Sequence, residues 1–231
     1  PIFHNILANL INKKFDLGFP LHILNIGGIS NITSTVDWKN LRQIRNEIKA
    51  YDVGPGNCLI DEWIRKNSEK KYDKNGLIAR SGKVDELVLN QALENFAGNS
   101  KYNKSLDVKD YNIFFAKGLS LENGAATITN FTAELIADGM KYVQTEEQPK
   151  VNKWLVCGGG RKNKYLLENI KNIFEKISIE LIDQYKINGD FVESQAFGYL
   201  AIRSFLKLPI SFPSTTGCKE PCTGGILIDN F

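Results

Sequence analysis

The chain has 231 residues, of which 42% are hydrophobic and 24% charged, so it can build one sizeable core and is not disordered. Its net charge of +3 comes from 29 basic and 26 acidic residues spread along the chain, which argues against a nucleic-acid partner. No apolar run is long enough to span a membrane and the first ten residues do not form a signal peptide, so we expect a cytoplasmic protein without a membrane partner.

The first half of the chain predicts a helical start and then a meander of strands. The opening ten residues have an amphipathic, helical pattern. Apolar runs and alternation predict strands over 21–26, 30–36 and 48–53, joined by turns that contain glycine. A helix over about 57–70 follows, with its apolar residues on one face.

The second half predicts helices that alternate with strands. Residues 71–119 are polar and interrupted by glycines, which indicates an inserted helical subdomain. Beyond it we predict helices over 123–143, 162–176 and 191–206, strands over 153–157 and 178–182, and a loop-rich tail from 209 to 231.

This order of elements is typical of the ribonuclease H-like arrangement, which actin-like ATPases and sugar kinases use twice, with ATP bound between two lobes. We expect residues 1–231 to form one such lobe. Its α/β fold would be a mixed five-stranded sheet with helices on both faces, plus the inserted segment 71–119.

The first segment with chemical potential is N-I-G-G-I-S-N, over 25–31, between two predicted strands. Glycines let the backbone turn sharply, and successive N–H groups in such a turn form a concave site for an anion. Ser30 and Asn31 add polar side chains. A tight hairpin without a ligand explains this segment equally well.

The second segment is Y-D-V-G-P-G-N, over 51–57, at the end of a strand and before a helix. Asp52 is well placed there to face a cleft, and Asn57 is a candidate cap for the helix. The alternative for Asp52 is a turn or capping carboxylate, the commoner role of an isolated aspartate.

The third segment is L-V-C-G-G-G-R-K-N, over 155–163, where a strand runs into a helix. Such a junction lets a flat ligand or a phosphate lie on the backbone and the helix N-terminus. A dinucleotide-binding site of the Rossmann type is excluded by context, because that motif belongs to the first strand–helix–strand unit and precedes an acidic residue.

The four cysteines do not indicate a metal centre. Cys58 and Cys157 lie in apolar surroundings and are expected to be small core residues. Cys218 and Cys222 form a lone C-x-x-x-C pair without a second Cys/His pair, so we predict no zinc site.

Five motifs in order make the chain resemble the anhydro-N-acetylmuramic acid kinases, and the resemblance covers essentially its whole length. The five are L-N-I-G-G-I-S-N-I-T (24–33), Y-D-V-G-P-G-N (51–57), G-A-A-T-I-T-N-F-T-A (124–133), V-C-G-G-G-R-K-N (156–163) and E-S-Q-A-F-G-Y-L-A (193–201). Members of this family open 1,6-anhydro-N-acetylmuramic acid with water and phosphorylate its O6 from ATP, in the recycling of cell-wall sugar. The resemblance thus implies an enzyme, a phosphotransferase that uses ATP and Mg²⁺.

The resemblance also implies a role for individual residues. Asp52 matches the position of the catalytic base. The phosphate loop corresponds to Gly27, Gly28, Ser30 and Asn31, and the adenosine loop to Gly158, Gly159, Gly160, Arg161 and Asn163. The residues expected near the sugar are Gly54, Gly56, Asn57 and Glu193. For Glu193 the alternative is a carboxylate that stabilises a helix N-terminus.

The sequence departs from the family in two places. The first phosphate loop of the superfamily, a G-T-S-like turn expected in an N-terminal lobe, is not found, and Val108 stands where relatives carry a substrate contact. We therefore expect the lobe to be incomplete as a kinase. Two alternatives stay open: another sugar kinase of the superfamily, or a non-catalytic lobe that binds a ligand. A homodimer is an expectation from the family alone.

Overall fold

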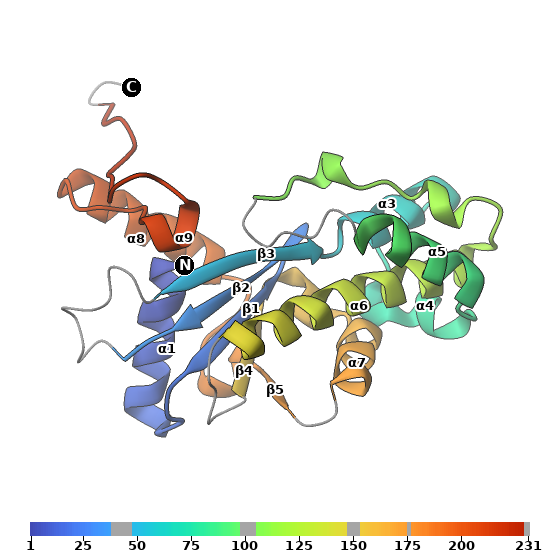
Figure 1. Ribbon diagram of the computed structural model, residues 1–231, viewed down its shortest axis with the longest axis horizontal. Coiled ribbons are helices and arrows are strands. Elements are labelled where there is room, and N and C mark those ends of the chain that lie inside the picture. The colour runs from blue at the N-terminus through green and yellow to red at the C-terminus, as the bar shows by residue number, and fades with distance from the viewer. Residues whose placement is uncertain (38–47, 98–104, 147–152, 175–176, 229–231) are drawn as a thin grey trace.

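The computed structural model describes residues 1–37, 48–97, 105–146, 153–174 and 177–228. Its centre is a five-stranded sheet in the order β3-β2-β1-β4-β5 (Figure 1). β1 is antiparallel to β2, β2 is antiparallel to β3, and β4 and β5 run parallel to β1. This topology confirms the predicted ribonuclease H-like lobe. The strands are Leu21–Ile26 (β1), Ile29–Thr35 (β2), Lys49–Pro55 (β3), Lys153–Cys157 (β4) and Ser178–Leu181 (β5).

The central strand β1 is apolar along most of its length because both of its faces are covered. Leu21 and Ile23 point into one core cluster, whereas Leu24 and Ile26 point into the other. Side chains alternate between the two faces of a strand, so a strand buried on both sides needs apolar residues at consecutive positions. The mostly apolar stretch at 21–26, in which Ile23 and Leu24 are consecutive, therefore already indicates a two-sided sheet.

Helices cover both faces, as predicted. On one face lie α1 (Ile2–Phe15) and α8 (Val192–Phe205), which pack on the smaller core cluster (Figure 1). The other face carries the long α6 with a group of shorter helices. These are α3 (Cys58–Asn67), α4 (Leu77–Ser81), α5 (Glu86–Ala97), α6 (Leu121–Glu146) and α7 (Lys164–Ile173).

The helix α7 begins two residues later than its apolar pattern predicts. The chain first makes a 3-10 turn over Gly159–Lys162, and the side chain of Asn163 then accepts a hydrogen bond from Leu166 N–H at 3.1 Å. This is the bond of an N-cap residue, which fixes the start of the helix. The remaining short helical turns are Lys74–Gly76, Val108–Asp110, Phe114–Ala116, Ile182–Tyr185 and α9 (Pro213–Thr216).

The segment predicted as an inserted subdomain shares the larger core cluster with the sheet. Buried residues of this segment, such as Ala79, Leu89 and Ile113, belong to the same cluster as Leu24 of β1. Residues 98–104 of the segment lie outside the described part of the chain. That it forms a subdomain of its own stays a prediction.

The two cysteines expected in the core are at least partly buried. Cys157 is buried and Cys58 is half-buried, as expected of small core residues.

Among the helices that the structure describes, none has the length and apolar composition needed to cross a membrane.

Candidate functional site

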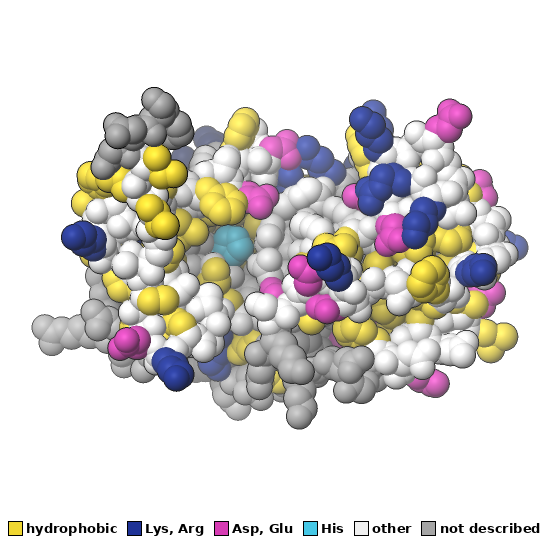
Figure 2. Space-filling view, turned by 90° about the horizontal axis from the view of Figure 1, so that it is seen from above, with side chains coloured by type: hydrophobic (Ala, Val, Ile, Leu, Met, Phe, Trp, Pro, Cys, Tyr) yellow, Lys and Arg dark blue, Asp and Glu magenta, His cyan; other side chains and the backbone are white. Residues whose placement is uncertain are grey.

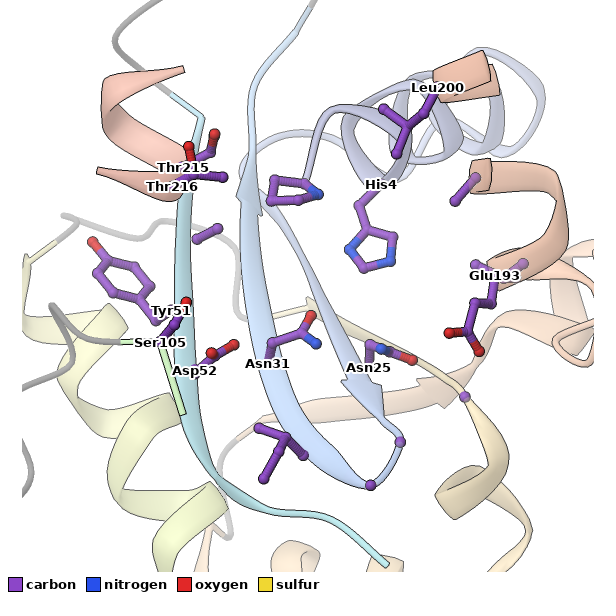
Figure 3. A pocket seen from close by; sticks show the side chains of 18 of the residues that line it. His4, Asn25, Asn31, Tyr51, Asp52, Ser105, Glu193, Leu200, Thr215 and Thr216 are labelled. Carbon is purple, nitrogen blue, oxygen red and sulfur yellow. The ribbon is translucent and has the colours of Figure 1, made fainter. Parts of the chain in front are cut away.

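A cavity of about 1000 Å³ opens where the β1–β2 hairpin, β3, the loop after β4 and the start of α8 converge (Figure 3). It brings together residues from segments that are far apart in the sequence. Predicted site residues in its wall are Gly27, Gly28, Asn31, Asp52, Gly158, Gly159 and Glu193. Both glycine loops and Asp52 therefore share one cavity.

The first glycine loop is held by the backbone of the turn that follows β3. Asn57 N–H donates to Gly27 O and Gly56 N–H to Gly28 O, both at 2.8 Å. A Cβ on Gly56 would lie 2.2 Å from Gly27 O, so only glycine permits this approach. On Gly27 or Gly28 a Cβ would meet its first neighbour at 3.4 or 3.7 Å. Those two glycines leave the loop's surface open toward the cavity.

The second glycine loop contains glycines of two kinds. Gly158 has a φ of 80°, and a Cβ there would lie 2.4 Å from Asn25 Oδ1. A Cβ on Gly160 would lie 2.1 Å from Ile26 Cγ2. Gly159 has its first neighbour only at 3.9 Å, the amide nitrogen of Asn57. The outer two glycines thus seat the loop on β1, and Gly159 faces open space.

Arg161 fastens the second loop from behind. The guanidinium is 5% exposed, and its Nε lies 2.8 Å from Asp183 Oδ2. Its Nη1 donates to Asp190 Oδ1 at 2.9 Å and to Gly158 O at 3.0 Å. Asp183 also accepts from Gly189 N–H at 3.2 Å. One arginine therefore ties the glycine loop to the segment that leads into α8.

The carboxylates around Arg161 respond to its charge. Its hydrogen bonds hold the pKa values of Asp183 and Asp190 below their ordinary range, and Lys162 reinforces the effect on Asp190. Both therefore stay ionised at neutral pH, and this keeps the loop fastened by charge-assisted hydrogen bonds.

Several predicted contact residues lie outside the cavity wall. Ser30 is fully buried and donates to Pro55 O at 3.2 Å, and Asn163 caps α7. Asn57 occupies the N-cap position of α3, as predicted, but its side chain makes no capping hydrogen bond. The full set outside the wall is Ser30, Gly54, Gly56, Asn57, Gly160, Arg161 and Asn163. These residues shape the loops, and any contact of theirs with a ligand stays a prediction.

Asp52 lies on the edge strand β3, opposite Asn31, next to a register shift in the β2–β3 ladder. Its Oδ2 accepts from Leu106 N–H at 2.9 Å, and Oδ1 has no partner among the described residues. Burial raises the pKa of Asp52, and the bond from Leu106 partly offsets that rise. The bonded residue is 54 positions away, so Asp52 neither caps a helix nor closes a local turn in the described structure.

Glu193 reaches the cavity from the side opposite Asp52 (Figure 3). It stands in the first turn of α8, where a carboxylate is favoured by the helix dipole. Both interpretations of Glu193 therefore agree with its position.

The cavity wall also contains polar residues to which the sequence assigned no role. His4 on α1, Asn25 at the end of β1 and Thr215 on α9 are among them (Figure 3). Asn25 had a signal, because it is the first residue of the segment N-I-G-G-I-S-N. Thr215 had none, since its segment carries only the composition of a loop.

Comparison with known proteins gives one consistent result. The family model described as anhydro-N-acetylmuramic acid kinase matches residues 2–230. A protein of that name from Pelagibacter ubique is 48% identical over 234 residues, which cover 100% of this chain and 60% of that protein. Its counterparts from Rhizorhabdus wittichii and Zymomonas mobilis are 38% and 37% identical, over 98% and 97% of this chain and 57% of each relative.

The chain thus spans less than two thirds of the length of these relatives. Among solved structures, an activator of 2-hydroxyisocaproyl-CoA dehydratase from Clostridium difficile with bound ADPNP is a distant likeness. It is 13% identical with a TM-score of 0.44, over 84% of this chain and 68% of that one.

Proposed function

This chain belongs to the anhydro-N-acetylmuramic acid kinase family, and from that premise we propose that it serves an ATP-dependent kinase of cell-wall sugar recycling. The proposed reaction hydrolyses the anhydro ring of 1,6-anhydro-N-acetylmuramic acid and transfers the γ-phosphoryl group of ATP to O6. The observation that carries the proposal is the shared cavity of the two glycine loops and Asp52. We expect the reaction to take place in the cytoplasm.

Asp52 is the proposed general base. A water molecule that attacks the anomeric carbon must lose a proton, and a carboxylate within hydrogen-bond reach can accept it. Cleavage of the anhydro bond frees O6, which then attacks the γ-phosphorus. The raised pKa of Asp52 makes its carboxylate a stronger base, and the Leu106 bond orients it while Oδ1 remains for the water.

The glycine loops are proposed to hold the nucleotide. The backbone N–H of Gly28 suits a phosphate oxygen, whereas the N–H of Gly27 already donates to Ile29 O at 3.2 Å and shapes the turn. The open surface of Gly159 suits the adenosine. Mg²⁺ bound to the phosphates would neutralise charge there, and because it usually keeps several waters it needs few protein ligands. Asn31 lies in the same wall, whereas Ser30, Gly160, Arg161 and Asn163 support the loops from behind.

The sugar is proposed to lie between Asp52 and Glu193. Gly54, Gly56 and Asn57 shape the turn beside it, because Gly56 lets that turn approach the first glycine loop. Residues 1–231 would form one lobe of the kinase, with 71–119 as its inserted subdomain. A homodimer is the assembly that we propose from the family.

The test uses this chain completed with the part of the Pelagibacter relative that it does not span. We expect Asp52→Asn to lower kcat by ~10²–10⁴, because asparagine keeps the shape but cannot accept the proton. ATP affinity and melting temperature should stay close to the unmodified values. Asp110→Asn is the matched control: among the described residues Asp110 accepts from Asp107 N–H, and it is not part of the cavity wall. Near-normal kcat in a folded Asp52→Asn protein would remove Asp52 as the base.

Two further assays separate this proposal from its alternatives. A panel of sugars with ATP tests whether another sugar is the better acceptor. The 231-residue chain by itself should turn over the anhydro sugar poorly, because closure of two lobes assembles the site in this superfamily. Turnover by the chain alone at the rate of the completed protein would contradict that expectation.

A further inference from the structure

His4 places a buried imidazole in the wall of the cavity. It lies in the first turn of α1, its side chain is 9% exposed, and Nδ1 is 2.9 Å from the hydroxyl of Thr33 on β2. The close view shows its ring reaching into the cavity on the side of Asn25 and Glu193 (Figure 3). Histidine atoms are also visible at the bottom of the hollow when the molecule is seen from above (Figure 2).

The contact with Thr33 determines the tautomer of His4. Thr33 is fully buried, and Nδ1 of His4 is the one partner that the described residues give its hydroxyl. A buried hydroxyl hydrogen without an acceptor is unfavourable, so the Thr33 hydroxyl donates to Nδ1. The ring proton then stands on Nε2. Burial lowers the pKa of His4 to about 3, so the imidazole is neutral at pH 7.

The other histidine of the chain shows what a structural imidazole does in the same sheet. His22 on β1 has Nδ1 2.9 Å from the hydroxyl of Ser34, the residue after Thr33 on β2. Its ring is completely buried against Trp154, with ring centres 4.4 Å apart, and its Nε2 is enclosed in the core. Both rings are thus anchored on a β2 hydroxyl. The Nε2 atom of His22 faces the core, and that of His4 has the cavity in front of it.

We propose that His4 is a sugar-binding residue whose Nε2–H donates a hydrogen bond to an uncharged oxygen of the substrate, a hydroxyl or an acetamido carbonyl. This inference rests on the proposed kinase function. Glu193 lies in the same part of the wall, and its negative charge disfavours a phosphate there. The apolar side chains of Ala196 and Leu200 beside it suit a sugar face rather than an anion.

The first experiment is nitrogen-detected NMR of the two histidines in this chain, at pH 7. We expect His4 to carry its proton on Nε2. Added 1,6-anhydro-N-acetylmuramic acid should shift the Nε2 signal of His4 and leave His22 unchanged, whereas ATP alone should shift neither. His4→Asn assigns the signals because it deletes one set. A proton on Nδ1, or a shift of His4 with ATP instead of the sugar, overturns the inference.

The second experiment compares two substitutions in the completed protein. His4→Asn keeps an amide near Nδ1 and Thr33 but has nothing at the position of Nε2, so KM for the sugar should rise about tenfold, the effect of one lost hydrogen bond. His4→Gln places an amide N–H near that position and should stay within about threefold of the unmodified KM. KM for ATP should not change in either variant.

The outcomes separate this inference from the kinase proposal. If the sugar shifts His4 but no phosphoryl transfer occurs, His4 binds the sugar and the kinase proposal fails. If phosphoryl transfer proceeds and His4→Asn has the unmodified KM for the sugar, the kinase proposal stands and the inference about His4 is wrong. An equal rise of KM in both variants, with a lowered melting temperature, assigns His4 a purely structural role.

Discussion

The two glycine loops meet in one cavity but are fastened by different forces. The hairpin loop at Gly27–Gly28 is held by neutral backbone hydrogen bonds from the turn after β3. The loop at Gly158–Gly160 is held by charged side chains, through Arg161 and its two aspartates. Neutral backbone bonds are insensitive to pH and salt, whereas ion pairs respond to both. The two halves of the proposed nucleotide site should therefore fail under different conditions.

The comparison also separates glycines that pack from glycines that face a ligand. Gly56 and Gly160 have no room for a Cβ, because another part of the protein occupies that space. Gly28 and Gly159 have room and line the cavity. A glycine in a motif can thus serve the fold or the ligand, and only the three-dimensional neighbours decide between these roles.

The largest effect on stability is expected from the ion pairs of Arg161 that hold the second glycine loop. Arg161→Ala should lower the free energy of unfolding by about 2–3 kcal/mol, below the usual range for a fully buried pair because Asp183 and Asp190 are 39% and 48% exposed. Urea unfolding measures it. Arg80→Ala is the control, since Arg80 pairs with Glu168 on the surface and should lose at most about 1 kcal/mol. Equal losses in both variants would remove the distinction between the two loops.

The next largest effect on stability is expected from the turn whose backbone hydrogen bonds hold the loop at Gly27–Gly28. Gly56→Ala should lower the free energy of unfolding by about 1–3 kcal/mol, because its Cβ would meet the backbone oxygen of Gly27. Gly28→Ala, whose Cβ has room, should change it by less than about 0.5 kcal/mol. Thermal and urea unfolding of this pair check the assignment. A Gly56→Ala protein as stable as Gly28→Ala would show that the hairpin loop is not held by this turn.

A smaller effect should appear in ligand binding. Gly159→Ala leaves the fold intact because its Cβ meets nothing closer than 3.9 Å, yet the methyl group would stand in the proposed adenosine site. We expect about tenfold weaker ATP binding, which corresponds to ~1.4 kcal/mol, with an unchanged melting temperature. Gly160→Ala should instead lower the melting temperature, because its Cβ would clash with Ile26. Calorimetric titration with ATP, beside thermal unfolding, distinguishes the two.

The smallest effect is the pH dependence of the stability that the ion pairs of Arg161 contribute. Arg161 lowers the pKa values of Asp183 and Asp190 in the folded state, so their contribution to stability is present above the ordinary aspartate value of 3.8. It is lost as the pH falls through the lowered folded values. The stability difference between the unmodified chain and Arg161→Ala should therefore shrink as the pH falls from about 4.5 to about 2.5. A difference that stays constant over that range would mean that charge does not hold this loop.

The fold could largely be predicted from the sequence because its signals are local. The apolar run of β1 and the glycine turns identify the strands, and their order with the later helices identifies the topology. Helix ends were less accurate: α3 ends at Asn67 rather than near residue 70, and α6 extends beyond its predicted 123–143. Apolar periodicity says where a helix is buried, not where its hydrogen bonds stop.

The site could be predicted only in part. Gly27, Asp52 and Gly158 are marked by motifs, and the structure brings them to one cavity. The fastening by Arg161 depends on Asp183 and Asp190, two residues with no motif of their own. The opening P-I-F-H, which ends at His4, resembles the end of a further motif of the family, but the partner Thr33 is 29 positions away and the sequence does not show their contact. Contacts between such distant residues become visible only after the chain has folded.

The parallel pairing of β1 with β4 also has a consequence for protein synthesis. Asn25 and Cys157 are neighbours in the sheet but lie 132 positions apart in the chain. At about 5–20 residues per second, a ribosome needs on the order of ten seconds to make the strand that covers this edge of β1. Until then the central strand presents unpaired N–H and C=O groups, which can recruit strands of other nascent chains. Slow codons between β1 and β4 should therefore increase aggregation, whereas slow codons after β4 should not.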